Sequence, residues 1–211
     1  MKNGILALLL ILGLSSLVKP VPENDWVSLF DGKSLNGWKV GKNAETFSIE
    51  NGSISVHGKV AHLFYVGDVN QHNFKNFEFK AQVMTRKSAN SGIYFHTEYQ
   101  EGGWPDKGYE VQVNNSQSDW RRTGSLYGID DVREVYVKDD EWYTEYIKVV
   151  GKHVTIKIND KTVVDYTEPE NPEHTKERPG RIISSGTFAL QGHDPGSQVY
   201  YKDIMVKVLH D

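Results

Sequence analysis

The stretch Ile93-Tyr94-Phe95-His96-Thr97-Glu98 alternates apolar and polar side chains, and Tyr109-Glu110-Val111-Gln112-Val113-Asn114 repeats the pattern after a loop. Successive side chains of a strand point to opposite faces, so each run predicts a strand with one apolar and one polar face. If the two strands share a sheet, their polar faces join into one surface. That surface would carry Tyr94, His96, Glu98, Glu110, Gln112 and Asn114.

Two interpretations of this polar surface are open. An antiparallel sheet commonly has one face in water, and polar residues there are ordinarily just solvated. However, Glu, Gln and Asn are weak strand formers, and their planar carboxyl and amide groups suit the recognition of hydroxyls. The residue types therefore favour a sugar-binding surface over a solvated face.

The rest of the chain predicts an all-β protein. Residues 77–83 alternate cleanly, Asn51-Gly52 predicts a tight hairpin, and residues 142–166 predict a three-stranded meander. Three prolines in residues 168–180 indicate a surface loop, because proline removes donors from a strand ladder. About a dozen strands without a long helix favour a two-sheet antiparallel sandwich, formed as a single domain by residues 21–211.

Residues 1–20 have the pattern of a signal peptide. Lys2 precedes an apolar run over residues 5–14, which is shorter than the roughly 20 residues that cross a bilayer. We therefore expect an exported protein, periplasmic or extracellular, without an integral membrane segment in its mature part. The chain has no cysteine, so core burial and not disulfides must stabilise it.

Charge argues against a nucleic-acid partner. The chain has 24 Lys and Arg against 28 Asp and Glu, a net charge of −4, whereas phosphate binding requires a basic surface. The sequence gives no indication of an oligomeric state.

Two loops carry tryptophan near the polar strands. Residues 119–128 crowd aromatic, basic and acidic side chains among glycines, which is typical of a loop that borders a binding site, and offer Trp120 and Tyr127. Trp104 lies in the loop of residues 100–108, where it either stacks on a sugar ring or closes the end of the sandwich. The second role is favoured.

Five segments occur in a fixed order along the chain: SLFDGKSLNGW (28–38), NSGIYF (90–95), GYEVQV (108–113), TGSLY (123–127) and GTFALQGHD (186–194). Together they resemble the markers of the 3-keto-disaccharide hydrolase family. The resemblance implies a jelly-roll sandwich of the concanavalin A-like lectin/glucanase type, with a concave sheet that faces carbohydrate. It also implies export and action on sugars oxidised at carbon 3.

One departure from the family is at His96, where members often have Arg. The departure implies that substrate contacts at this position differ.

A 3-keto sugar allows glycosidic cleavage by elimination. The carbonyl at carbon 3 acidifies the hydrogen on carbon 2, so a base can remove it and the enolate can expel the glycosidic oxygen from carbon 1. This needs a base, an acid and a group that stabilises the enolate. Glu110 and His193 are the candidates for the proton-transfer pair, in either order. Candidates for substrate binding are Tyr94, His96, Gln112, Asn114, Trp120, Tyr127 and Gln191.

Other roles stay open. A divalent metal at the keto oxygen would use Glu98 and Asp194, with His96 as a further ligand, although their spacing matches no recognised motif. Retaining hydrolysis would need a second carboxylate beside Glu110, for which Glu98 is the candidate. A noncatalytic carbohydrate-binding module on the same fold is the alternative function. We interpret the remaining histidines as surface or structural residues: His57, His62, His72, His153 and His174.

Overall fold

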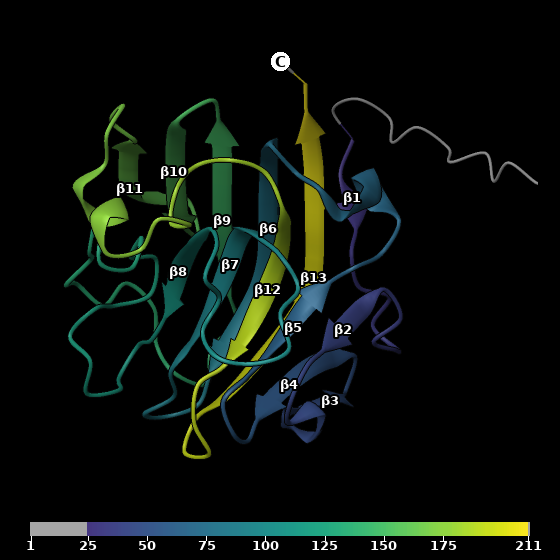
Figure 1. The fold of residues 1–211 in the computed structure, drawn as a ribbon. Helices are drawn as coiled ribbons and strands as arrows, with labels where there is room; N and C mark the ends of the chain where they lie inside the picture. Colours follow the sequence, from purple (N-terminus) through teal and green to yellow (C-terminus); the bar gives the residue numbers. More distant parts are fainter. Residues whose placement is uncertain (1–24, 211) are drawn as a thin grey trace, which may run out of the picture.

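The computed structural model describes residues 25–210, so the predicted signal peptide lies outside the described residues. The chain forms two antiparallel sheets, as Figure 1 shows, and the all-β prediction is confirmed. The strands are β1 (Val27–Ser28), β2 (Trp38–Val40), β3 (Phe47–Glu50), β4 (Ser53–His57), β5 (Ala61–Tyr65), β6 (Asn76–Thr85), β7 (Ser91–Thr97), β8 (Tyr109–Val113), β9 (Tyr143–Val150), β10 (His153–Ile158), β11 (Lys161–Thr167), β12 (Thr187–Gly192) and β13 (Gln198–Leu209).

The larger, eight-stranded sheet has the order β11-β10-β9-β6-β13-β4-β3, and β1 pairs with β13 beside this path. The five-stranded sheet has the order β2-β5-β12-β7-β8. Three short 3-10 helices lie in the connections: η1 (Ala44–Thr46), η2 (Val69–His72) and η3 (Glu173–Lys176). No helix within residues 25–210 has the length and apolar character to cross a membrane.

The core lies between the two sheets. Strand β6 contributes every second side chain to this core, in line with the period of two. The buried residues are Phe77, Phe79, Ala81 and Val83. Burying one such large side chain stabilises the fold by about 1.5–3 kcal/mol. The apolar residues of β7 and β8 pack into the same core from the opposite sheet.

Local turn chemistry agrees with the sequence. Asn51 and Gly52 both have positive φ, of 49° and 77°, and join β3 to β4 with Glu50 opposite Ser53. That is the geometry that an Asn-Gly hairpin favours. The predicted meander is also present, as β9, β10 and β11.

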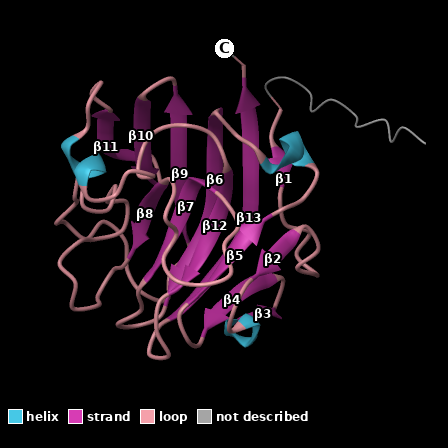
Figure 2. Cartoon of the chain, viewed as in Figure 1, coloured by secondary structure: helices cyan, strands magenta, loops and turns pink. Residues whose placement is uncertain are grey.

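Strand register places the polar residues of the smaller sheet in two transverse rows on its outer face. One row runs through His62, Gln191, Gly92 and Gln112, and the next through Phe64, Ala189, Tyr94 and Glu110. The long connections of the chain gather over this sheet, as Figure 2 shows. Loops therefore surround the outer face of the smaller sheet.

Candidate functional site

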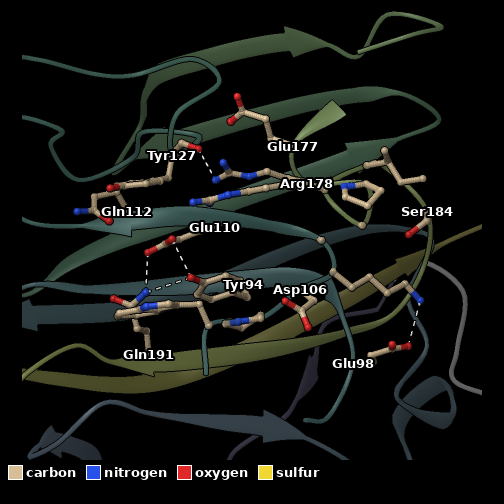
Figure 3. Close-up of a pocket in the computed structure, with 18 of the residues that line it drawn as sticks. Tyr94, Glu98, Asp106, Glu110, Gln112, Tyr127, Glu177, Arg178, Ser184 and Gln191 are labelled. Carbon is tan, nitrogen blue, oxygen red and sulfur yellow. Dashed lines mark hydrogen bonds and ion pairs between the residues drawn. The ribbon is translucent and has the colours of Figure 1, made fainter. Parts of the chain in front are cut away.

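Glu110 is the centre of a buried hydrogen-bonded group on the outer face of the smaller sheet. Its carboxylate accepts a hydrogen bond of 2.8 Å from the Tyr94 hydroxyl and one of 2.7 Å from Gln191 Nε2. Gln191 Nε2 also donates to the Tyr94 oxygen, at 3.2 Å. Figure 3 shows the three side chains converging from β8, β7 and β12. The carboxylate is thus held in place from three strands.

Gly92 makes room for this carboxylate. A Cβ at Gly92 would lie 2.6 Å from Glu110 Oε1 and 2.9 Å from its Cγ, so the Glu110 side chain leans across the space that a side chain at position 92 would fill. Burial raises the pKa of Glu110, while the hydrogen bonds from Tyr94 and Gln191 act in the opposite direction. A carboxyl group with a raised pKa is suited to proton transfer near neutral pH.

A cavity of about 870 Å³ opens over Glu110. Several residues predicted from the sequence line this one cavity: Tyr94, Glu98, Glu110, Gln112, Tyr127, Gln191 and His193. Its volume falls in the range of about 300–1,000 Å³ that is usual for small-molecule sites. The structure therefore brings the predicted glutamate and loop histidine to a shared concavity, together with groups that can bind hydroxyls.

His193 enters the cavity from the connection between β12 and β13. Its Nδ1 is 2.7 Å from Asp194 Oδ2, and the same oxygen accepts a hydrogen bond of 2.9 Å from Ser197. Burial alone would raise the pKa of Asp194. Hydrogen bonds from His193, Ser197 and Gly196 outweigh burial and lower this pKa. The ionised carboxylate orients the imidazole and leaves Nε2 for other partners, which is an arrangement that suits a general base.

Arg181 is a cavity residue that the sequence did not indicate. It lies in the connection between β11 and β12, just after the proline-rich residues 168–180, and its Nη2 donates to the carbonyl oxygen of Tyr127. Burial and the neighbouring Arg178 lower the pKa of Arg181, whereas Glu110 favours its charged form. The sequence predicts a surface loop over residues 168–180, and a lone arginine directly after such a loop gives no signal in the sequence.

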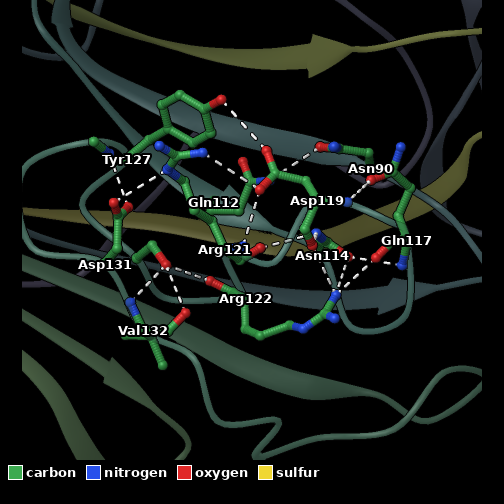
Figure 4. Close-up of polar contacts among 12 residues, drawn as sticks. Asn90, Gln112, Asn114, Gln117, Asp119, Arg121, Arg122, Tyr127, Asp131 and Val132 are labelled. Carbon is green, nitrogen blue, oxygen red and sulfur yellow. Dashed lines mark hydrogen bonds and ion pairs between the residues drawn. The ribbon is translucent and has the colours of Figure 1, made fainter.

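The loop of residues 119–128 is organised by Asn114, as Figure 4 shows. Asn114 Nδ2 donates to the carbonyl oxygens of Asp119 and Arg121, at 2.9 Å and 2.8 Å, and its Oδ1 accepts from the Gln117 amide. These bonds use the amide fully. Asn114 therefore shapes the loop and is absent from the cavity lining, contrary to its expected place among the substrate-binding residues.

Trp120 also lies outside the cavity. Its ring packs against the guanidinium groups of Arg121 and Arg133, at 4.7 Å and 3.9 Å from the ring centroid. Tyr127, from the same loop, does line the cavity, and its hydroxyl lies 3.4 Å from Asp119 Oδ2. The loop thus borders the site through Tyr127 and not through its tryptophan.

The expectation that His96 shares a face with Tyr94 is wrong. His96 has a φ of 55°, and the pairing of β12 with β7 shifts register beside it, so the strand alternation breaks there. The ring turns into the core against Phe77 and Phe95. Burial lowers the pKa of His96 to about 4. His96 therefore packs in the core and does not line the cavity.

Each of the two predicted metal ligands has other partners in the structure. Glu98 lies at the edge of the cavity, where its carboxylate pairs with Lys107 at 3.4 Å, and Asp194 is occupied by His193 and Ser197. Residues 25–210 contain no group of three or more His, Asp or Glu side chains arranged to hold a metal ion. Glu98, Asp194 and the core residue His96 are therefore not gathered into such a group.

Trp104 contributes more to the site than predicted, and His62 lies beside it without lining the cavity. Trp104 lines the cavity with 48% of its surface exposed, and its ring lies 5.6 Å from the rings of both His62 and His193. It is therefore available for stacking and does not close the end of the sandwich. Burial lowers the pKa of His62 to about 4, helped by His193, so His62 is neutral at neutral pH. The pairing of His62 with Gln191 depends on sheet order, which the sequence did not reveal.

Comparison with known proteins supports the resemblance. A 3-keto-disaccharide hydrolase of Bacteroides thetaiotaomicron is 30% identical over 182 residues, which cover 72% of this chain. The chain spans 62% of the length of that relative.

Solved structures share the fold. A protein of Parabacteroides distasonis, provisionally assigned as a glycosyl hydrolase, superposes with a TM-score of 0.73 at 23% identity and covers 88% of this chain and 94% of its own. The carbohydrate-binding module CBM66 of Bacillus subtilis has a TM-score of 0.56 at 11% identity, with coverage of 81% and 95%. The sequence family model matches residues 25–207, almost the whole described domain. The chain belongs to the 3-keto-alpha-glucoside-1,2-lyase-like domain family.

Proposed function

We propose that this protein is an exported enzyme that cleaves the glycosidic bond of 3-keto-glycosides by elimination through an enolate. The observation that carries the proposal is the meeting of Glu110 and His193 in one cavity, among tyrosine and amide groups suited to a sugar. The name of the Bacteroides relative supports the substrate class. Export rests on the signal-like residues 1–20 of the sequence.

In the proposed reaction, His193 removes the hydrogen from carbon 2 as a proton, and its Nε2 is the base because Nδ1 faces Asp194. The electron pair of the carbon–hydrogen bond forms the enolate with the carbonyl at carbon 3. The enolate then expels the oxygen on carbon 1, and Glu110 gives that oxygen a proton as the bond breaks. The products are the free alcohol and a sugar with a double bond between carbons 1 and 2. Addition of water to that double bond would give the 3-keto sugar.

The surroundings of Glu110 favour this route over retaining hydrolysis. A retaining enzyme needs a second carboxyl group about 5–5.5 Å away to act as nucleophile. The hydrogen-bonding neighbours of Glu110 are instead a phenol and an amide, Tyr94 and Gln191. The predicted second carboxylate, Glu98, is paired with Lys107 and has 69% of its side chain exposed.

The direct test offers the purified protein methyl 3-keto-α-glucoside and 3-keto-trehalose, with unmodified trehalose as the control. We expect free alcohol or glucose to appear together with 3-ketoglucose or the unsaturated ketosugar, and no reaction with trehalose. Substitution of His193 by Ala should abolish exchange of the carbon-2 hydrogen with deuterated water. Absence of turnover on every 3-keto-glycoside, with and without added divalent cations, would refute the proposal.

The alternative is a noncatalytic carbohydrate-binding module, because the same fold occurs in CBM66. It predicts saturable binding of a glycan without product, and little loss of affinity on Glu110→Gln. A binding platform needs chiefly exposed aromatic rings, such as Trp104 in this cavity. Sugar binding alone does not require a buried carboxyl group with a raised pKa such as Glu110, so we favour the enzyme.

A further inference from the structure

Arg181 places a buried positive charge in the cavity wall. Its residue surface is only 9% exposed, and none of the ion pairs among residues 25–210 includes it. A buried arginine that is not matched by a carboxylate is costly, because an unpaired charge loses hydration. Such a group is usually kept where an anion or a developing negative charge binds.

The backbone at Arg181 is fixed from several sides. Its amide donates to the Arg178 carbonyl at 3.0 Å, and its own carbonyl accepts a hydrogen bond of 2.8 Å from His174 Nε2. The preceding residue, Gly180, accepts a hydrogen bond of 2.9 Å from the Gly108 amide. A Cβ at Gly180 would lie 2.3 Å from the Asp106 carbonyl oxygen, so only glycine allows this close approach. The arginine is therefore positioned before any ligand binds.

The guanidinium group retains donors for a ligand. It carries five N–H groups in a planar fork, and the bond to the Tyr127 carbonyl comes from Nη2. No hydrogen bond from its Nε or Nη1 to another residue of the described chain is present. Arg181 also lies close enough to Glu110 for their charges to influence each other. The donors and the proton-transfer carboxyl group thus face the same space.

We infer that Arg181 is a catalytic residue that binds the oxygen on carbon 3 of the substrate and stabilises it as the enolate forms. The inference rests on the proposed elimination, in which that oxygen changes from a neutral carbonyl to an anion. A fixed cation in a site with little water stabilises such a charge without reorganising. The charge of Arg181 does not transfer a proton, so the roles of His193 and Glu110 are unchanged.

Two other roles for Arg181 make different predictions. A cation that stabilises the departing alkoxide would matter less for a leaving group that departs readily. A cation that only binds substrate equally in its ground and transition states would change KM and leave kcat unaltered. Leaving-group dependence and the division between kcat and KM therefore distinguish the three roles.

The test compares wild type, Arg181→Met and Arg181→Lys on methyl and 4-nitrophenyl 3-keto-α-glucosides, and follows deuterium exchange at carbon 2. The control is Arg133→Met, which removes an exposed arginine that packs on Trp120 outside the cavity. For Arg181→Met we expect kcat to fall about 10²–10³-fold on both substrates, with a parallel loss of exchange. Arg181→Lys should keep part of the rate, because it retains the charge and loses the fork. Arg133→Met should stay within about twofold of wild type, as is usual for surface substitutions.

A loss confined to the methyl glycoside, or to KM, would overturn the inference. An active wild type together with an unaltered Arg181→Met would overturn it and leave the proposed function standing. A wild type without activity on any 3-keto-glycoside would overturn both. If circular dichroism shows that Arg181→Met does not fold, Arg181→Lys tests the inference instead. The inference is then refuted if Arg181→Lys cleaves both glycosides at the wild-type rate, or if its rate falls for only one of the two.

Discussion

Gly92→Ala is a stringent test of how Glu110 is held. The new Cβ would lie 2.6 Å from Glu110 Oε1, 2.9 Å from Cγ and 3.1 Å from Cδ. Ordinary contact needs about 3.4 Å or more, so the carboxylate must move by about 1 Å. That movement weakens the bonds from Tyr94 and Gln191, at 2.8 Å and 2.7 Å. Misplacement by 1 Å can cost about 10²-fold in rate, and overpacking typically costs about 1–3 kcal/mol of stability.

The assay is a double-mutant cycle between Gly92→Ala and Glu110→Ala, read by urea unfolding. In the Glu110→Ala background the obstructing atoms are absent, so Gly92→Ala should cost less than about 0.5 kcal/mol or even stabilise the strand. In the wild-type background it should lower the free energy of unfolding by about 1–3 kcal/mol and reduce turnover about 10²-fold. Equal effects in both backgrounds would refute the argument that Gly92 exists to accommodate Glu110.

Three further predictions follow from single groups. Glu110→Gln should slow cleavage of methyl 3-keto-α-glucoside about 10²–10⁴-fold and spare the 4-nitrophenyl glycoside, whose leaving group needs no acid; equal losses would contradict the assignment. His96 has a folded pKa of about 4 against 6.5 unfolded, so its contribution to stability is complete above pH 6.5 and is lost as the pH falls to 4. The free energy of unfolding of wild type, measured at several pH values, should therefore exceed that of His96→Asn by an amount that shrinks by up to about 3 kcal/mol as the pH falls over that range. A difference that does not depend on pH would contradict this prediction. Glu145 is fully buried, neither carboxyl oxygen has a hydrogen-bond partner, and burial raises its pKa. Glu145→Leu should raise the free energy of unfolding at pH 7 by about 1–3 kcal/mol, with a gain that grows as the pH rises above 4.5, and a destabilised variant would oppose this account.

Local patterns predicted the fold because each strand carries its own signal. The alternation in β6 identifies which residues enter the core, and Asn51-Gly52 fixes one hairpin without reference to the rest of the chain. The same alternation placed Tyr94, Glu110 and Gln112 on the outer face of the smaller sheet. These inferences depend only on the period of two, which holds wherever a strand is regular.

The sequence did not predict the positions of residues that depend on a backbone irregularity or on the order of strands in the sheet. His96 leaves the polar face because of one residue with positive φ, and strand alternation cannot reveal that break. His62 and Gln191 become neighbours only because β5 pairs with β12, although the two strands are far apart in the chain. Arg181 depends on bonds from Gly108 and His174 to a proline-rich connection, which has no periodic pattern.

The candidate site divides its chemistry between strands and loops. Glu110 and its hydrogen-bonding partners stand on three strands of one sheet, whereas His193 and Arg181 come from the connections on either side of β12. Because β12 is the central strand of the sheet and both connections attach to it, its register determines where His193 and Arg181 lie relative to Glu110. A bulge beside Thr187 already shifts that register near the Arg181 end. Changes that move β12 should therefore lower the rate through all three groups, while changes in Trp104, on a different connection, should affect which sugar is bound.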